Sequence, residues 1–313
     1  MAKQLGVLMD SIAGIHYKKD STLAMLFEAQ KRGYTIYYFE QKDVFLRDGV
    51  VQAHAQILKL YHNSQKWFEF ERSQQIPLSM LDIILMRKDP TFNLEYIYTT
   101  YLLEHAERSG VVIVNKPQSL RDANEKMFTS WFPECCPKTL VTSSIDLLRA
   151  FFMEHQDIVC KPLEGMGGTS IFRLQYPDMN ASVVFEVLTH QGSSFMMAQQ
   201  FIPAINQGDK RILLINGKPI PYALARIPAA GELRGNLAAG GSGVAQPLTA
   251  RDYWICEQVA PILREKGLIF VGLDVIGDYL TEINVTSPTC IRELDEQCGL
   301  NISETLFDSL ESL

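Results

Sequence analysis

Residues 270–285 constrain the chain most, because they form two short apolar runs that carry acidic or amide side chains and are separated by a turn. This pattern predicts a β-hairpin. Asp274 lies in the first run, while Glu282 and Asn284 lie two positions apart in the second. Side chains two apart on a strand point to the same face, so we expect Glu282 and Asn284 side by side.

The length of the turn decides whether Asp274 faces the same way. A two-residue turn at 277–278, the usual hairpin turn, pairs Asp274 with Thr281. Glu282 then lies on the opposite face. A three-residue loop through Tyr279 instead pairs Asp274 directly with Glu282.

Two facing carboxylates repel each other, so a cation between them is the main reason for such a pair. Oxygen ligands that leave positions open for phosphate are how proteins hold Mg²⁺ beside a nucleotide. A solvated hairpin whose polar face is acidic explains the same residues equally well. The hairpin alone leaves both interpretations open.

The composition is that of a globular protein with about two domains: 313 residues, 47% hydrophobic and 21% charged. The net charge of -7 argues against nucleic-acid binding, which needs a basic surface. The first residues do not have the pattern of a cleaved leader, and no apolar run is long enough to span a bilayer. We therefore expect a cytoplasmic protein with no nucleic-acid or membrane partner.

The six cysteines include no C-x-x-C pair, and the six histidines include no H-E-x-x-H motif. Neither a zinc site nor a disulfide framework is indicated. A mechanism centred on histidine is not favoured either.

The first third of the chain has the pattern of a parallel α/β domain. A strand at 5–9, a helix at 21–32 capped by Asp20, and a strand at 35–39 form one βαβ unit. A further strand at 81–86 ends in a dense set of charges that begins with Arg87. Because parallel sheets bind ligands at the carboxyl ends of their strands, these charges are a candidate substrate surface. A solvated loop is the alternative.

The phosphate chemistry is expected further on. After a helix that contains Lys126, a strand at 157–162 carries Lys161 near its end and runs into a glycine-rich loop at 165–168. Backbone N–H groups of such a loop can close on an anion. Residues 171–173 resemble a strand, so the loop is a hairpin tip and not a P-loop. A plain turn is the common explanation of such a tip, and Lys161 in front of it favours phosphate binding.

Two further segments suggest ligand contacts. The strand at 196–203 stops at a proline, and its backbone edge could pair with an adenine ring or belong to ordinary sheet. Arg211 and Arg226 lie on neighbouring strands joined by a turn at 216–218, which predicts a clamp for anionic groups.

Residues 229–244 are too long and too rich in glycine for a simple connection, and they include Arg234 and Asn236. We interpret this segment as a lid. Its flexibility would come from Gly231, Gly235, Gly240 and Gly241.

Together these residues resemble the ATP-grasp superfamily of carboxylate–amine ligases and, within it, the bacterial glutathione synthetases. The segments that carry the resemblance are Met86-Arg-Lys-Asp-Pro, Asn115-Lys-Pro-Gln-Ser-Leu-Arg-Asp, Arg234-Gly-Asn-Leu-Ala-Ala-Gly-Gly and Thr281-Glu-Ile-Asn-Val-Thr-Ser-Pro-Thr-Cys-Ile-Arg. The resemblance runs from end to end, and the last two segments are the most specific. One departure is Phe201, where relatives often have tyrosine; main-chain contacts would survive this change.

The resemblance implies an α/β fold in three parts. An N-terminal Rossmann-like domain would span 1–122, a central ATP-grasp lobe 123–202, and a C-terminal lobe 203–313. ATP would lie between the last two.

It also implies roles for single residues. ATP would contact Lys126, Lys161, Gly165, Met166, Gly167, Gly168, Gln199, Gln200, Phe201, Ile202 and Asp209. Two Mg²⁺ ions, for which Mn²⁺ could substitute, would be held by Asp274, Glu282 and Asn284. The substrates would contact Arg87, Arg226, Arg234, Asn236, Ser287 and Thr289. Catalysis would fall to Lys161, Arg211 and Arg226.

The implied reaction is the ATP-dependent ligation of γ-glutamylcysteine and glycine. ATP would convert the cysteinyl carboxylate into an acyl phosphate, and the lid would protect it from water while the amine of glycine attacks. Because the metal needs Asp274 opposite Glu282, the hairpin should have a loop of three or more residues. The family also implies a homo-oligomer, commonly a tetramer.

Two alternatives stay open at this point. Another ATP-grasp ligase, of D-alanine:D-alanine or glutamate-adding type, would share the nucleotide and metal residues. A catalytically inactive nucleotide-binding regulator would belong to another class, although loss of catalysis usually removes metal ligands that are all present here.

Overall fold

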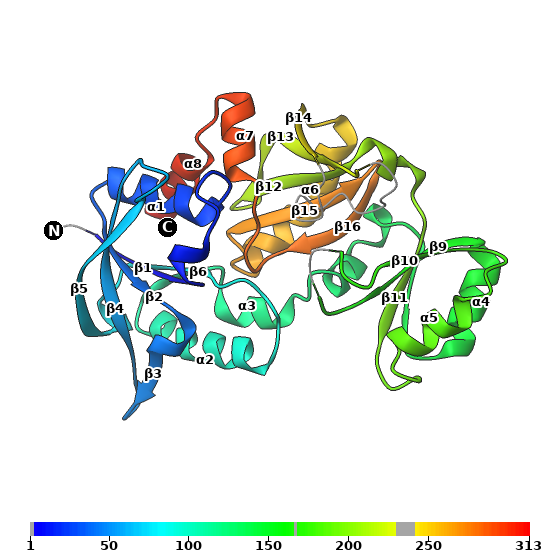
Figure 1. Ribbon diagram of the computed structural model, residues 1–313, viewed down its shortest axis with the longest axis horizontal. Helices are drawn as coiled ribbons and strands as arrows, with labels where there is room; N and C mark the ends of the chain where they lie inside the picture. Colours follow the sequence, from blue (N-terminus) through cyan, green and yellow to red (C-terminus); the bar gives the residue numbers. More distant parts are fainter. Residues whose placement is uncertain (1–2, 166–167, 230–241) are drawn as a thin grey trace.

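The computed structural model describes residues 3–165, 168–229 and 242–313. Three β-sheets follow one another along the chain. The sheet formed by the last strands lies between the other two in space (Figure 1). The C-terminal part of the chain is therefore placed to contact both of the others.

The first sheet has seven strands in the order β3-β4-β2-β1-β6-β7, with β5 paired to β4. β1, β2, β6 and β7 are parallel, as the βαβ pattern predicts. Its strands are β1 (Gln4–Met9), β2 (Thr35–Phe39), β3 (Val44–Arg47), β4 (Val50–Leu60), β5 (Phe68–Pro77), β6 (Ile83–Arg87) and β7 (Val112–Val114). β5 was not predicted, because most of its side chains are exposed and it lacks the alternation of a half-buried strand.

Local sequence signals set most helix ends. The side chain of Asp20 accepts a 2.6 Å hydrogen bond from Leu23 N, which caps the first helix as predicted. The α-helices are α1 (Ser21–Lys31), α2 (Leu94–Arg108), α3 (Pro117–Asp122), α4 (Ile145–His155), α5 (Ala181–Leu188), α6 (Ala250–Glu265), α7 (Ile291–Cys298) and α8 (Ile302–Glu311).

The helix predicted around Lys126 is wrong. α3 ends at Asp122, and Lys126 lies in the turn before a short 3-10 helix, Met127–Trp131. The side chain of Asn124 accepts hydrogen bonds from the N–H groups of Lys126 and Met127, at 3.1 and 2.9 Å. These bonds replace the backbone hydrogen bonds that an α-helix would make there.

The second sheet is antiparallel, in the order β10-β9-β11-β8. Its strands are β8 (Thr139–Thr142), β9 (Asp157–Pro162), β10 (Phe172–Gln175) and β11 (Met196–Gln200). Its core includes Phe152 of α4 and Phe185 of α5, and both helices contribute further apolar side chains. The glycine-rich loop connects two antiparallel strands, β9 and β10, as predicted.

The third sheet is also antiparallel, in the order β14-β13-β12-β15-β16. Its strands are β12 (Asp209–Ile215), β13 (Lys218–Ile227), β14 (Ser242–Pro247), β15 (Phe270–Ile276) and β16 (Tyr279–Asn284). The predicted turn after β12 is present, with Asn216 and Gly217 both at positive φ.

The hairpin of β15 and β16 has the predicted register but not the predicted loop. Asp274 pairs with Glu282, yet Ile276 pairs with Tyr279 across a turn of only two residues. The prediction of a longer loop is therefore wrong. A β-bulge adds Thr281 to the second strand and shifts its side chains by one position, which has the same effect on register as a longer loop.

One buried side chain ties this hairpin to the first sheet. Asn115, just after β7, donates through Nδ2 to the carbonyls of Phe270, at 2.8 Å, and Val285, at 2.7 Å. Its Oδ1 accepts from Phe270 N at 2.8 Å. The same residue thus fixes the start of β15 and the end of β16.

Part of the predicted lid lies outside the described residues, which stop at 229 and resume at 242. Residues 242–244 were predicted to belong to the loop, which is wrong. They pair with β13 and form the start of β14. No helix in the described parts of the chain has the length and apolar character needed to cross a membrane.

Candidate active site

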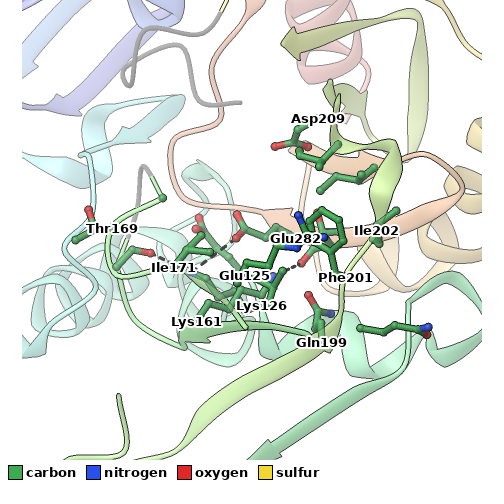
Figure 2. A pocket seen from close by; sticks show the side chains of 18 of the residues that line it. Glu125, Lys126, Lys161, Thr169, Ile171, Gln199, Phe201, Ile202, Asp209 and Glu282 are labelled. Atoms are coloured by element: carbon green, nitrogen blue, oxygen red, sulfur yellow. Dashed lines mark hydrogen bonds and ion pairs between the residues drawn. The ribbon is translucent and has the colours of Figure 1, made fainter. Parts of the chain in front are cut away.

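A cavity lies between the second and third sheets (Figure 2). One end is formed by Gln199, Gln200, Phe201 and Ile202, which follow or end β11. The other end holds cationic and carboxylate side chains, among them Lys126, Lys161, Glu125 and Glu282. Such a cavity, apolar at one end and charged at the other, suits a nucleotide.

Two lysines supply the positive charge. Lys126 Nζ donates to the carbonyl of Gly165 at 3.0 Å and lies 3.9 Å from Glu282 Oε1. Lys161 Nζ lies 3.4 Å from the carbonyl of Thr281, the bulge residue. Burial lowers the pKa of Lys161, so an incoming anion would favour its charged form.

At the other end of the cavity, main-chain hydrogen bonds fix the segment at 199–202. The N–H groups of Gln200 and Phe201 donate to the carbonyls of Lys138 and Asp157, at 2.9 and 3.0 Å. These two N–H groups are therefore occupied by protein partners. A base in the cavity would use other main-chain groups of the segment.

Arg173 belongs to this end of the cavity, although the sequence analysis did not select it. Its guanidinium lies 3.5 Å from the centre of the Phe201 ring, and it makes two hydrogen bonds to Asp157, of 2.9 and 2.7 Å. Its position on the strand after the glycine-rich loop was the available signal. The two hydrogen bonds to Asp157 orient Arg173, and its guanidinium in turn holds the Phe201 ring in place by stacking on it.

Arg211 and Arg226, the predicted clamp for anionic groups, bind carboxylates of the protein itself in this structure. Arg211 donates to Asp274 through Nε and Nη2, at 2.5 and 3.0 Å. Arg226 Nη2 lies 2.9 Å from Asp274 Oδ2 and also pairs with Asp209. All four side chains come from neighbouring strands of the third sheet.

The fold shifts the pKa values of Asp274 and Asp209 in opposite directions. Burial opposes ionisation of Asp274, but the charges of Arg211 and Arg226 outweigh it and hold the pKa below its usual range. Burial raises the pKa of Asp209 to about 6, and Arg226 only partly compensates. Asp209 lines the cavity, and its Oδ1 is buried without a partner among the described residues.

The three predicted metal ligands lie on the hairpin of β15 and β16. Glu282 and Asn284 line the cavity, and Asp274 faces Glu282 across the hairpin. Asn284 donates Nδ2 to the carbonyl of Gly272 at 3.3 Å, which leaves its Oδ1 as the possible ligand atom. His, Cys, Asp and Glu side chains of the described residues form no metal-binding group of three. The carboxylate of Glu282 and the amide oxygen of Asn284 suit a hard divalent cation. Asp274 does not line the cavity, and both of its oxygens pair with Arg211 or Arg226.

Three predicted substrate residues lie elsewhere. Arg87 is buried between α1 and the segment after β16: it donates to Thr22 Oγ1 of α1 at 3.0 Å and to the carbonyl of Pro288 at 2.8 Å. Ser287 lies 3.5 Å from the carbonyl of Arg87, whereas Thr289 is exposed. None of the three lines the cavity between the second and third sheets.

Glu125 is a cavity residue that the sequence analysis missed. Its Oε1 accepts a 2.9 Å hydrogen bond from the hydroxyl of Thr286, and its carbonyl accepts from Ile283 N at 2.8 Å. Burial and the nearby charge of Glu282 raise its pKa. The only feature of the sequence that could have indicated a role for Glu125 is its position next to Lys126.

The structure places the other predicted nucleotide residues as follows. Gly165 and Gly168 line the cavity with φ angles of 100° and 79°. The remaining predicted residues lie outside the described residues: Met166, Gly167, Gly231, Arg234, Gly235, Asn236, Gly240 and Gly241.

Solved structures share this architecture. A D-cycloserine synthetase matches with a TM-score of 0.68 over 98% of this chain and 99% of its own, at 15% sequence identity. A RiPP-associated ATP-grasp ligase from Chryseobacterium gregarium, solved with ADP and a leader and core peptide, matches with a TM-score of 0.64 over 100% of this chain and 97% of its own, at 16% identity. Fold and cavity together define an ATP-grasp protein, a class that uses ATP with divalent metal ions.

The chain belongs to the prokaryotic glutathione synthetase family. The family's N-terminal domain matches residues 4–121, and its ATP-grasp domain matches residues 125–299. The glutathione synthetase of Pseudomonas syringae pv. tomato is 58% identical over 311 residues, which cover 99% of this chain and 98% of that protein. The glutathione synthetase of Escherichia coli K12 is 55% identical over 309 residues, with the same coverage. The predicted fold class, family and type of enzyme, an ATP-dependent ligase, are confirmed.

Proposed function

We propose that this chain joins γ-glutamylcysteine to glycine and cleaves ATP to ADP and phosphate. The observation that carries the proposal is the cavity between the second and third sheets, with two lysines at its charged end, in a chain that matches glutathione synthetases over nearly its whole length. Free energy from ATP is needed because a carboxylate is a poor electrophile.

The nucleotide orientation follows from the two ends of the cavity. The base lies at 199–202, beside the ring of Phe201, and Asp209 accepts from the ribose hydroxyls. The phosphates lie at Lys126 and Lys161, whose charges offset those of the phosphate oxygens. Gly165 and Gly168 allow the backbone of the loop to approach them without a side chain in the way.

In the first step an oxygen of the cysteinyl carboxylate attacks the γ-phosphorus, and ADP leaves. The amine nitrogen of glycine then attacks the carbonyl carbon, the amine loses a proton, and phosphate leaves. Arg211 and Arg226 are the proposed donors to the oxygen that becomes negative in this second step. Their ion pairs with Asp274 fix both guanidinium groups in advance of the reaction.

Asp274, Glu282 and Asn284 are the proposed holders of Mg²⁺, with Mn²⁺ as a substitute, and the bound cations would neutralise phosphate charge. Arg211 and Arg226 keep Asp274 ionised but also occupy its oxygens, so Asp274 would have to share them with a cation. Asn284 suits it because its amide is oriented by the carbonyl of Gly272.

The function is tested by measuring ADP release from ATP with purified protein. γ-Glutamylcysteine plus glycine should release ADP and form glutathione in equal amounts. Release of ADP with D-alanine alone, or with glutamate as the added amino acid, and none with the proposed pair would contradict the assignment.

Three broader features stay proposals. The domain limits at 122 and 202 lie between the sheets, which span residues 4–114, 139–200 and 209–284. The cytoplasmic location is supported by six free cysteines. A homo-oligomer is the third proposal, and light scattering on the purified protein would measure it.

A further inference from the structure

The side chain of Gln199 points from β11 into the cavity, at the same end as Phe201 and Ile202 (Figure 2). It is 4% exposed, so its partners are set by the protein and by whatever occupies the cavity. A glutamine amide accepts hydrogen bonds through its oxygen and donates them through its nitrogen. The group that the amide turns toward the cavity therefore decides which ligand atoms it can bind.

Thr139 determines the orientation of this amide. It begins β8 and lies directly opposite Gln199 in the second sheet. Its hydroxyl oxygen lies 2.8 Å from the carbonyl oxygen of Pro137 and 3.0 Å from the amide of Gln199. A hydroxyl has one proton and a carbonyl can only accept, so this proton goes to Pro137. The hydroxyl must then accept from Gln199, which presents its Nε2 to Thr139.

With Nε2 held by Thr139, Oε1 is the group of Gln199 that is left for a ligand. Among the described residues, none donates a hydrogen bond to Oε1. The base end of the cavity thus contains an acceptor. Adenine carries an amino group at C6, which donates, whereas hypoxanthine and guanine carry an oxygen there, which accepts. The amide of Gln199 suits the first kind of base and repels the second.

We propose that Thr139 is a positioning residue that makes the nucleotide site selective for a 6-amino purine over a 6-oxo purine. The inference rests on the proposed function, since it requires the base of ATP at 199–202. A 6-oxo purine would require the amide of Gln199 to turn over. Its Oε1 would then face the hydroxyl of Thr139, whose proton is held by Pro137, and two acceptors would lie in contact. Thr139 itself does not line the cavity, so it acts through Gln199.

A simpler role for the same hydroxyl is a cross-strand bond that ties β8 to β11. Such a bond would contribute to stability and have no effect on the choice of base. Base selectivity is therefore the quantity that distinguishes the two roles.

The test is the substitution Thr139→Val, which keeps the branched shape of the side chain and removes the hydroxyl. The amide of Gln199 is then free to turn. The unaltered protein should have a higher kcat/KM with ATP than with inosine triphosphate. We expect the ratio of these two values to fall about 10- to 100-fold in Thr139→Val, the range for two acceptors that are no longer held in contact. The bases also differ at N1, but this difference is common to both proteins and cancels when their ratios are compared.

The matched control is Thr139→Ser, which keeps the hydroxyl and should keep the ratio of the unaltered protein. An equal ratio in the unaltered protein and in Thr139→Val would overturn the inference and leave Thr139 the role of joining β8 to β11. A fall of the same size in Thr139→Ser would also overturn it, because the hydroxyl is still present in that variant.

A binding measurement separates this inference from the proposed function. The Kd values for ADP and for inosine diphosphate are measured by calorimetry without the amino-acid substrates, and their ratio should shift in Thr139→Val as the kinetic ratio does. A protein that shows this shift but does not join γ-glutamylcysteine to glycine would contradict the proposed function alone. Equal binding of the two diphosphates by the unaltered protein, a result that needs no variant, would show that Gln199 does not select the base and would overturn the inference.

Discussion

At the scale of single residues, Asp209 shows how the fold prepares a ligand contact. One carboxylate oxygen pairs with Arg226, and the other is buried without a partner among the described residues. Burial raises the pKa of Asp209 to about 6. The folded protein therefore binds this proton more tightly than the unfolded chain, so that protonation stabilises the fold at low pH and this contribution is lost as the pH rises through about 6.

The pKa of Asp209 predicts a pH dependence of nucleotide binding. Only the ionised carboxylate can accept from both ribose hydroxyls, so the KM for ATP should rise as the pH falls below about 6, by up to about tenfold per pH unit. The measurement is the KM for ATP between about pH 5 and about pH 8. Asp209→Asn should raise the KM for ATP at neutral pH and remove this dependence, and an identical profile in both proteins would contradict the assignment.

At the scale of elements, the hairpin of β15 and β16 depends on one glycine. Gly272 lies next to Arg211 in the third sheet, and a Cβ at this position would come within 2.8 Å of Arg211 Cδ and 3.1 Å of Pro288 Cβ. The absence of a side chain lets Arg211 lie across β15 and reach Asp274. Gly272 thus leaves the space in the third sheet that the side chain of Arg211 occupies.

Gly272→Ala should displace Arg211 from Asp274. We expect a loss of about 1–3 kcal/mol in the free energy of unfolding, the range for overpacking of a buried site, together with a fall in kcat. Urea unfolding and steady-state kinetics measure the two effects. Gly14→Ala is the matched control, since a Cβ there meets nothing within 4 Å. Equal behaviour of the two variants would mean that Arg211 does not need this space.

At the scale of the whole molecule, Asn115 joins the first sheet to the hairpin that carries the proposed metal ligands. Its side chain makes three hydrogen bonds to main-chain groups of Phe270 and Val285, and it is 2% exposed. Loss of these bonds would leave buried main-chain groups unsatisfied. The position of the hairpin relative to the N-terminal part of the chain therefore depends on this residue.

Asn115→Leu should lower the free energy of unfolding by about 2–4 kcal/mol, because three buried main-chain groups lose their partner. Equilibrium denaturation, followed by circular dichroism, measures this change. Asn180→Ala serves as the control, because Asn180 is exposed and its side chain makes no capping bond to α5. A loss no larger than that of the control would show that other contacts hold the hairpin.

The sequence by itself determined the features that depend on neighbouring residues. The alternation of apolar positions in 270–285 predicted the hairpin, Asp20 predicted the start of α1, and Lys161 before a glycine-rich loop predicted the charged end of the cavity. Each of these signals is complete within a few residues, since strand alternation, helix capping and turn preference are local. The motifs of the resemblance added the family, and the full-length matches confirmed it.

The tertiary structure alone decided which distant residues meet. The bulge at Thr281 corrects the hairpin register, and nothing in the local sequence distinguishes it from a longer loop. The pairing of Arg211 with Asp274, the stacking of Arg173 on Phe201 and the hydrogen bond between Gln199 and Thr139 all join segments that are far apart in the chain. Their charges and distances depend on partners that only the folded chain brings together, which is the physical reason why the sequence did not reveal them.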